Sequence, residues 1–168
     1  MKLDMIEIGH IVNAHGIRGE VRVLPRNQKP EFLTRFRTFY LHGQAVAPTA
    51  NHVHKNFVLL KLPGVDDMNA ALALKETPLF IRRDDARLGP NEAVDEELPG
   101  VEVFSADTGE LLGTINLVET YPASKVYTVK GTKTYLIPAV PGVFIQSLNL
   151  EENRMEVHVL KGMADDEN

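Results

Sequence analysis

Short segments in which apolar residues alternate with other residues, each ended by a turn, run along most of the chain. Over residues 6–12 the alternation predicts a strand, and over residues 21–23 it predicts a second one. Between them, Gly16 and Gly19 allow a positive φ or a close approach of the backbone, which predicts a loop. This pattern favours a protein of many short strands. The residues that share a face of these strands are Ile6, Ile8, His10 and Val12 in the first and Val21 and Val23 in the second.

The rest of the first half continues in the same way and contains one well-marked helix. Asp66 is a natural N-cap for that helix, Asp67 adds negative charge to its first turn, and Pro78 ends it. Such a set of elements suggests a small β-barrel with the helix at one end. Further strands are predicted over residues 38–41, 44–47, 56–62 and 79–82, with a helical turn near Pro30.

The second half begins with an acidic stretch and then returns to strands. Residues 84–98 combine Asp and Glu with glycine and proline and show no apolar period, so we expect a linker or an exposed loop. Three hairpins, over residues 101–118, 126–138 and 144–160, then indicate a second small β-barrel. We therefore predict a mostly β (α+β) protein with two small barrels. Its predicted parts are a first barrel domain (1–83), the linker (84–98), a second barrel domain (99–163) and a disordered tail (164–168).

Composition excludes several classes of protein. The 168 residues suffice for one ordinary domain or two small ones, and they include no cysteine, which excludes disulfides, thiolate nucleophiles and cysteine-bound metals. No apolar run approaches the roughly 18 residues that a membrane-spanning helix needs. The N-terminus reaches Glu7 without a signal-like apolar stretch, so we expect a cytoplasmic protein with no membrane partner.

Charge is distributed unevenly between the two halves. Residues 1–83 hold 12 Lys and Arg against 7 Asp and Glu, whereas residues 84–168 hold 6 against 16. A mildly basic half can face phosphates, and an acidic half can face a basic protein. The alternative, that the acidity only keeps the protein soluble, is equally compatible with these charges.

Catalytic motifs are scarce in this sequence. His52 and His54 lie two residues apart, so within a strand both would face one side and could begin a metal site, but no third ligand follows at a recognisable spacing. The chain has three serines and no G-x-S-x-G motif, P-loop or dinucleotide-binding glycine pattern. We therefore expect no catalytic residue, metal or cofactor. An enzyme that uses the face of His52 and His54 remains the alternative.

The loop after the first strand is the best candidate for binding a partner. Arg18 stands between Gly16 and Gly19, which lets the backbone approach a partner closely. Basic residues in such a setting neutralise phosphates and fix orientation without reading a nucleotide sequence. A hairpin loop with solvated arginines explains the same residues, and chemistry alone leaves the two interpretations level. The candidate residues are His15, Gly16, Arg18, Gly19, Arg22, Arg26 and Lys29.

Two motifs in the first half resemble the RimM family of bacterial ribosome maturation factors. One is the stretch Gly9–Val23, which includes the loop described above, and the other is Leu62–Ala71 followed by Leu74 and Lys75. The resemblance covers roughly residues 6–163. The second half resembles a PRC barrel through the segments Leu98–Val103, Thr108–Gly113, Leu136–Val140 and Arg154–Val157.

The resemblance implies a binding protein rather than an enzyme. Family members bind the head of the immature small (30S) ribosomal subunit through ribosomal protein nineteen of that subunit, and they assist processing of its 16S rRNA. The implied fold is a translation-factor-like β-barrel followed by a PRC barrel. We expect a cytoplasmic monomer without a cofactor. A stand-alone RNA-binding module without a protein partner is a further alternative, and a steep salt dependence of binding to naked RNA would favour it.

One departure from the family pattern lies at the start of the second barrel. The family usually has a pair of tyrosines there, whereas this chain has Ala93 and Val94, and Glu97 replaces an aspartate. Aromatic residues often anchor interfaces, so in their absence we expect the acidic run to attract a basic ribosomal protein through charge. The candidate residues for that contact are Ala93, Val94, Asp95, Glu96 and Glu97.

Overall fold

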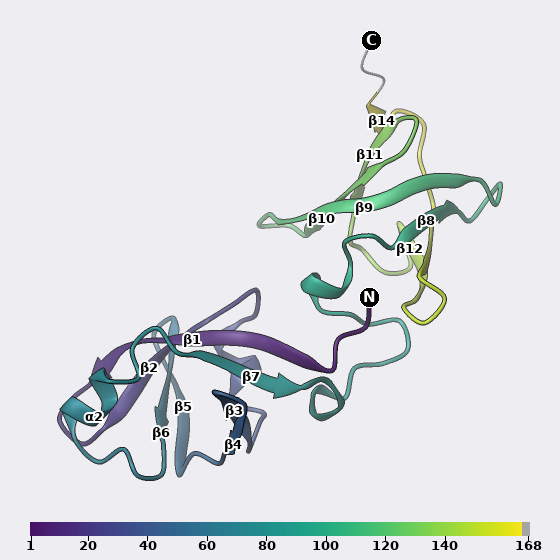
Figure 1. Ribbon diagram of the computed structural model, residues 1–168. Coiled ribbons are helices and arrows are strands. Elements are labelled where there is room, and N and C mark those ends of the chain that lie inside the picture. The colour runs from purple at the N-terminus through teal and green to yellow at the C-terminus, as the bar shows by residue number, and fades with distance from the viewer. Residues whose placement is uncertain (166–168) are drawn as a thin grey trace. The chain divides into compact units, whose positions relative to one another are not determined.

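The computed structural model describes residues 1–165, which form two compact units with one seven-stranded sheet each (Figure 1). Asp4–Arg87 form one unit, here called the first domain. The other unit, here called the second domain, consists of residues 88–165 together with Met1–Leu3. Strands account for most of the regular structure and the helices are short, so the predicted mostly β class with two small barrel-like sheets is confirmed.

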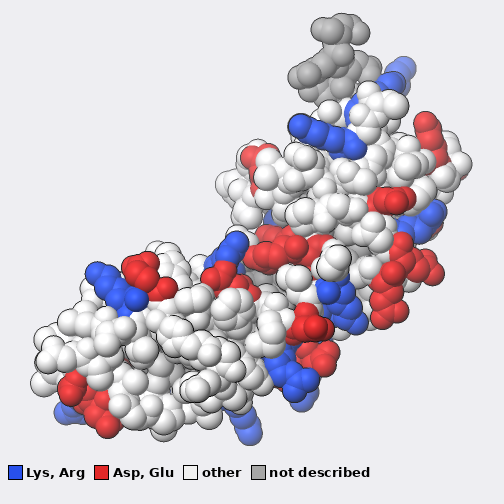
Figure 2. Space-filling view, in the orientation of Figure 1, with Lys and Arg blue, Asp and Glu red and all other residues white. Residues whose placement is uncertain are grey.

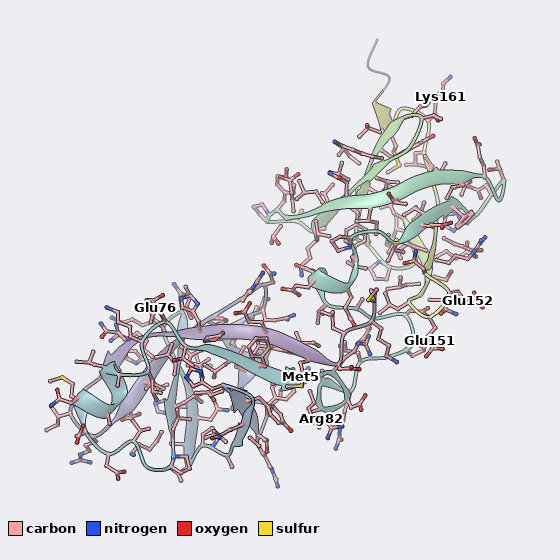
Figure 3. The ribbon with its side chains drawn as sticks, viewed as in Figure 1. Met5, Glu76, Arg82, Glu151, Glu152 and Lys161 are labelled. Carbon is pink, nitrogen blue, oxygen red and sulfur yellow. The ribbon has the colours of Figure 1, made fainter. Side chains whose placement is uncertain are left out.

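The first domain is an antiparallel sheet in the order β4-β3-β7-β1-β2-β6-β5. Met5 pairs with Arg82 where the long strand β1 begins and β7 ends, and Figure 3 labels both residues there. Its elements are β1 (Met5–His15), β2 (Glu20–Pro25), α1 (Pro30–Leu33), β3 (Phe39–Leu41), β4 (Gln44–Val46), β5 (Ala50–His54), β6 (Phe57–Lys61), α2 (Met68–Leu72), β7 (Pro78–Arg82) and the 3₁₀ helix η1 (Arg83–Ala86).

Alternation along β1 and β2 places one set of side chains in the core of the first domain, as predicted for Ile6 and Ile8 in β1 and for both valines of β2. The prediction is wrong for His10 and Val12, because irregularities in the pairing of β1 shift its alternation and Ile11 is buried instead. A β-bulge between Ile11 and Asn13 shifts the pairing with β2, so Ile11 faces Val23 inward while Asn13 and Arg22 pair on the outer face. The outer face of β2 is therefore free to carry polar residues. Buried apolar residues of this core include Ile6, Ile8, Ile11, Val21, Val23, Leu33, Phe39, Val58, Leu60, Leu79 and Ile81.

Two details of the first domain differ from the sequence prediction. The helix α2 is capped by Asp67, whose side chain accepts a hydrogen bond from the Ala70 amide at 2.7 Å. Asp66, the predicted cap, instead forms an ion pair with Lys61, with Nζ and Oδ1 3.0 Å apart. The sequence does not predict strand β5, because its residues are mostly polar and show no clear apolar alternation. In the structure β5 pairs antiparallel with β6.

The second domain contains the three predicted hairpins, which pair as β8–β9, β10–β11 and β12–β13. The sheet has the strand order β12-β13-β8-β9-β10-β11-β14, in which β14 is added to the strands of the three hairpins. Strands β13 and β8 form a parallel ladder, which hairpins alone do not predict. The core is built from residues such as Val103, Ile115, Val129, Ile137 and Met155. The elements are η2 (Asp95–Glu97), β8 (Glu102–Ser105), β9 (Leu111–Thr120), β10 (Lys125–Lys130), β11 (Thr134–Pro138), β12 (Ile145–Asn149), β13 (Arg154–Val157) and β14 (Ala164–Asp165).

The two ends of the second half correct the sequence prediction. The sequence predicts a linker or an exposed loop over residues 84–98, yet Val94, Glu97 and Leu98 are buried, so exposure is wrong for these three. The tail was expected to be disordered from residue 164, but β14 pairs with β11 through Ala164 and Asp165. The remainder of the predicted tail, residues 166–168, lies outside the described residues. Within residues 1–165 no helix has the length and apolar character needed to cross a membrane.

Candidate functional site

The loop between β1 and β2 projects two side chains while its second glycine packs against a neighbouring loop. Gly16 and Gly19 both have positive φ angles, +72° and +91°. Nothing lies within 4 Å of the position that a Cβ would take at Gly16, whereas at Gly19 that position is already filled by the backbone carbonyl of Val65. Arg18 is exposed, and beside it Ile17 has 76% of its surface accessible. Gly19 therefore serves packing, and the exposed tip is the part of the loop that can meet a partner.

Side chains from four strands meet on the outer face of the first-domain sheet. The Nη2 atom of Arg22 lies 3.1 Å from Nδ1 of His15, and since a guanidinium only donates, this imidazole nitrogen accepts. The guanidinium carbon lies 5.2 Å from the centroid of the Phe57 ring. The rings of His15 and His54 are in contact, with centroids 5.1 Å apart. We call this group, His15, Arg22, His54 and Phe57, the outer-face cluster.

The arginine of the outer-face cluster is partly buried. The four members of the cluster are each only partly exposed, and Leu59, which pairs with Arg22 and points to the same face, is 3% exposed. Nε of Arg22 is enclosed, and it has no hydrogen-bond partner among residues 1–165. Buried donors normally have an acceptor, so this one is an exception that needs an explanation.

Arg26 and Lys29 do not join the other predicted binding residues. Arg26 forms an ion pair with Glu7, and it follows the end of β2 that is farther from the loop. Lys29 is exposed at the N-terminus of α1. A six-residue strand spans about 20 Å, which separates both residues from Arg18. Figure 2 likewise shows basic and acidic side chains interspersed on the visible face of this domain. The predicted set of seven residues is therefore not one continuous patch.

The segment that contains Ala93 and Val94 packs inward. Ala93 is partly buried and packs against the core cluster of the second domain. Val94 is 3% exposed, so its side chain is part of the interior. Both positions therefore pack toward the interior of the second domain.

The acidic run of the second domain is largely committed to contacts within that domain. Asp95 forms an ion pair with Lys125, with 2.7 Å between Oδ1 and Nζ, and Glu96 is partly buried. Glu97 is fully buried. Its carboxylate oxygens accept hydrogen bonds from the Leu3 amide at 2.9 Å and the Val94 amide at 3.0 Å. Glu97 is thus a structural acceptor, and the exposed part of the run is smaller than its sequence suggests.

The N-terminus contributes to the same arrangement. The amino group of Met1 donates to the backbone carbonyl oxygen of Glu97 at 2.7 Å. Residues 1–3 therefore belong with η2 in the second domain, although β1 begins in the first domain at Met5. No sequence pattern signals this contact, because it joins positions 96 residues apart.

Two further features bear on the enzymatic alternative and on sites that the sequence did not suggest. Within residues 1–165 no three His, Asp or Glu side chains are arranged to hold a metal ion, and His54 contacts His15 instead.

A groove of about 960 Å³ in the first domain was not predicted. Clustered arginines at 35–37 and 82–87 were its only signal in the sequence. The groove is lined by Arg35, Phe36, Arg37, Thr38, Asp84, Asp85, Ala86 and Arg87.

Comparison with known proteins places the chain in a family. Residues 6–86 match the family model of the RimM N-terminal domain. The ribosome maturation factor RimM of Acetivibrio thermocellus is 36% identical over 98% of this chain and 99% of its own length. The ribosome maturation factor RimM of Clostridioides difficile is 32% identical over 98% of each chain. A crystal structure from Pseudomonas aeruginosa, described as a 16S ribosomal RNA processing protein RimM, is 27% identical over 94% of this chain and 98% of that one, with a TM-score of 0.46. Because the two sequence relatives exceed 30% identity along nearly the full length of both chains, this protein belongs to the RimM family.

Proposed function

We propose that this protein is a maturation factor of the small ribosomal subunit. It binds the head of the immature 30S subunit, through ribosomal protein nineteen of that subunit and nearby 16S rRNA, and assists rRNA processing and assembly of the head. It acts by binding alone, as a cytoplasmic monomer without a cofactor. The observation that carries the proposal is the similarity to ribosome maturation factors over 98% of this chain and 99% of the relative.

The two domains suit different parts of such a target. In the first domain, exposed Arg18 and the outer-face cluster offer a guanidinium and aromatic rings to rRNA. The second domain comes from the acidic half of the chain, which suits a basic ribosomal protein. Since Val94 and Glu97 are interior residues, the protein contact in this region falls on Asp95, Glu96 and the surface around them.

The mechanism that follows from binding alone is a shift of populations. A factor that binds a native-like arrangement of the head more tightly than misfolded ones raises the population of the native-like form by the ratio of the two affinities. No covalent step is needed for this effect. The factor must then leave when the mature head no longer offers its binding surface, so binding to precursors should exceed binding to finished subunits.

Sedimentation with purified subunits tests the proposal. The full chain is centrifuged with small-subunit precursors, mature small subunits or large subunits, and the fraction that comigrates is measured. We expect comigration with small subunits, strongest with the precursors, and none with large subunits. Equal binding to both subunits, or to neither, would contradict the proposal. Metal bound stoichiometrically to the purified protein would instead favour the enzymatic alternative.

A further inference from the structure

We propose that the outer face of β1, β2, β6 and β5 is a platform for unpaired RNA, on which a nucleobase stacks against the His15 and His54 rings while flanking phosphates contact basic residues at its rim. The inference rests on the proposed function and deepens it, because it names single-stranded rather than duplex rRNA as the nucleic acid that the first domain recognises.

The register of the sheet brings the required side chains to one face. Arg22 pairs with Leu59, and Leu59 pairs with His52, so these residues form a row across β2, β6 and β5. His54 and Phe57 form the neighbouring row. Residues that pair directly in a ladder point to the same side of a sheet. The face therefore presents imidazole and phenyl rings beside a guanidinium, although the core lies on the other side of the same strands.

The chemistry of these groups matches unpaired nucleotides. Sequence-tolerant binding of single-stranded RNA relies on aromatic or histidine rings and arginine planes on which exposed bases stack. His15 and His54 meet at an interplanar angle of 59° and both remain partly exposed, so part of each ring is accessible to a base. Arg22 is held in place by its contacts with His15 and Phe57. A double helix hides its bases from such a surface, which limits it to phosphate contacts.

Basic side chains lie at the rim of this face. Arg18 is exposed in the loop that follows His15, and Lys55 is exposed in the turn that follows His54. Both can meet phosphates that flank a stacked base. Glu20 is an acidic residue on this face, and it pairs in the ladder with His15 on one side and Lys61 on the other. Glu7 of β1, between the buried Ile6 and Ile8, also points outward, but it forms an ion pair with Arg26. The basic groups at the rim therefore outweigh the remaining acidic charge.

Binding of two model RNAs tests the platform. The full chain is titrated with a single-stranded RNA of about ten nucleotides that carries 2-aminopurine near its centre, and with the same strand annealed to its complement. We expect the single strand to bind at least about fivefold more tightly than the duplex and its 2-aminopurine fluorescence to change on stacking. His54→Ala should weaken single-strand binding at least about fivefold and leave duplex binding within about twofold. His54→Phe, which keeps a ring, should retain the preference.

Controls separate this inference from the proposed function. His158→Ala removes a partly exposed histidine of the second domain and should leave binding to both RNAs unchanged. The platform is overturned if single strand and duplex bind equally, if His54→Ala weakens both alike, or if it weakens subunit binding but neither RNA. If His54→Ala does not fold, His54→Phe replaces it in the test. Weaker binding of the single strand by His54→Phe than by the wild type then overturns the platform. If the RNA titration fails but the protein still comigrates with small subunits, only the platform is refuted. If the protein binds the single strand but does not comigrate with small subunits, only the proposed function is refuted.

Discussion

Gly19 lies directly against the backbone carbonyl of Val65, so the β1–β2 loop and the loop before α2 are packed backbone to backbone. Lys61 reinforces this contact, because its Nζ donates to the same Val65 carbonyl and lies 3.0 Å from Oδ1 of Asp66. The two sequence motifs that indicate the family therefore meet in space. Arg18, the neighbour of Gly19, is positioned by a contact that it does not itself make.

Gly19→Ala should destabilise the first domain by about 2 kcal/mol or more, because a Cβ would overlap the Val65 carbonyl and alanine disfavours a φ of +91°. Gly16→Ala is the matched control, since its φ is also positive but the space around it is open. It should cost only about 1 kcal/mol, from the backbone conformation alone. Urea unfolding followed by circular dichroism measures both. Equal losses for the two variants would show that the contact with Val65 contributes nothing.

Arg18→Ala should leave the free energy of unfolding within about 0.5 kcal/mol of the wild type, because the side chain is exposed. It should weaken comigration with small subunits about tenfold, the loss expected for one charged hydrogen bond. Arg18→Lys keeps the charge and should recover only part of the binding if the contact is bidentate, because an ammonium group cannot reproduce the two parallel hydrogen bonds of a guanidinium. Lys29→Ala, at the other end of β2, is the control and should bind like the wild type. A loss of binding with Lys29→Ala as large as with Arg18→Ala would contradict the separation of the two residues.

Glu97→Ala should destabilise the second domain by at least about 2 kcal/mol, because the Leu3 and Val94 amides would lose their acceptor beside the core. Faster hydrogen exchange of these two amides should accompany the loss. Glu110→Ala removes an exposed carboxylate of the same domain and should change stability by no more than about 0.5 kcal/mol. Unaltered exchange at Leu3 in Glu97→Ala would refute the role of this carboxylate in holding the N-terminal residues.

Burial, and secondarily the charge of Asp95, raise the pKa of the Tyr127 phenol above its ordinary value of 10.0. The neutral phenol is therefore favoured by folding, and its contribution to stability is complete below pH 10.0 and is lost as the pH rises through the raised pKa. Asp95→Asn should lower the pKa of Tyr127 part of the way back, since burial remains. Titration of tyrosinate absorbance, with Tyr127→Phe to assign the signal, measures the change.

Tyr121 supplies an internal comparison for that titration. The charge of Glu119, followed by a hydrogen bond from the phenol to this carboxylate, raises the pKa of Tyr121. Glu119→Gln should therefore lower the pKa of Tyr121 and leave that of Tyr127 in place. A shift of Tyr127 in Glu119→Gln, or no shift in Asp95→Asn, would contradict these assignments.

Local patterns in the sequence were sufficient for most elements of the fold. Alternation predicts strands because a strand's side chains have a period of two, and this identified β1, β2 and the three hairpins of the second domain. It failed for β5, whose residues Ala50–His54 are mostly polar and become a strand through pairing with β6. The parallel ladder of β8 and β13 was equally invisible, because it joins segments about fifty residues apart.

The candidate site was likewise predicted from the sequence in part, and its other features depend on long-range pairing. The sequence by itself determined the glycine-flanked loop, with Arg18 at its exposed tip, and the family to which the chain belongs. Only the tertiary structure decided that the rings of His15 and His54 are in contact, that Arg26 forms an ion pair with Glu7, and that Glu97 is buried. The physical reason is that exposure and partners depend on long-range register and packing. A bulge in β1 and the ladders among β2, β6 and β5 set which distant side chains share a face, and no local spacing of residues encodes those pairings.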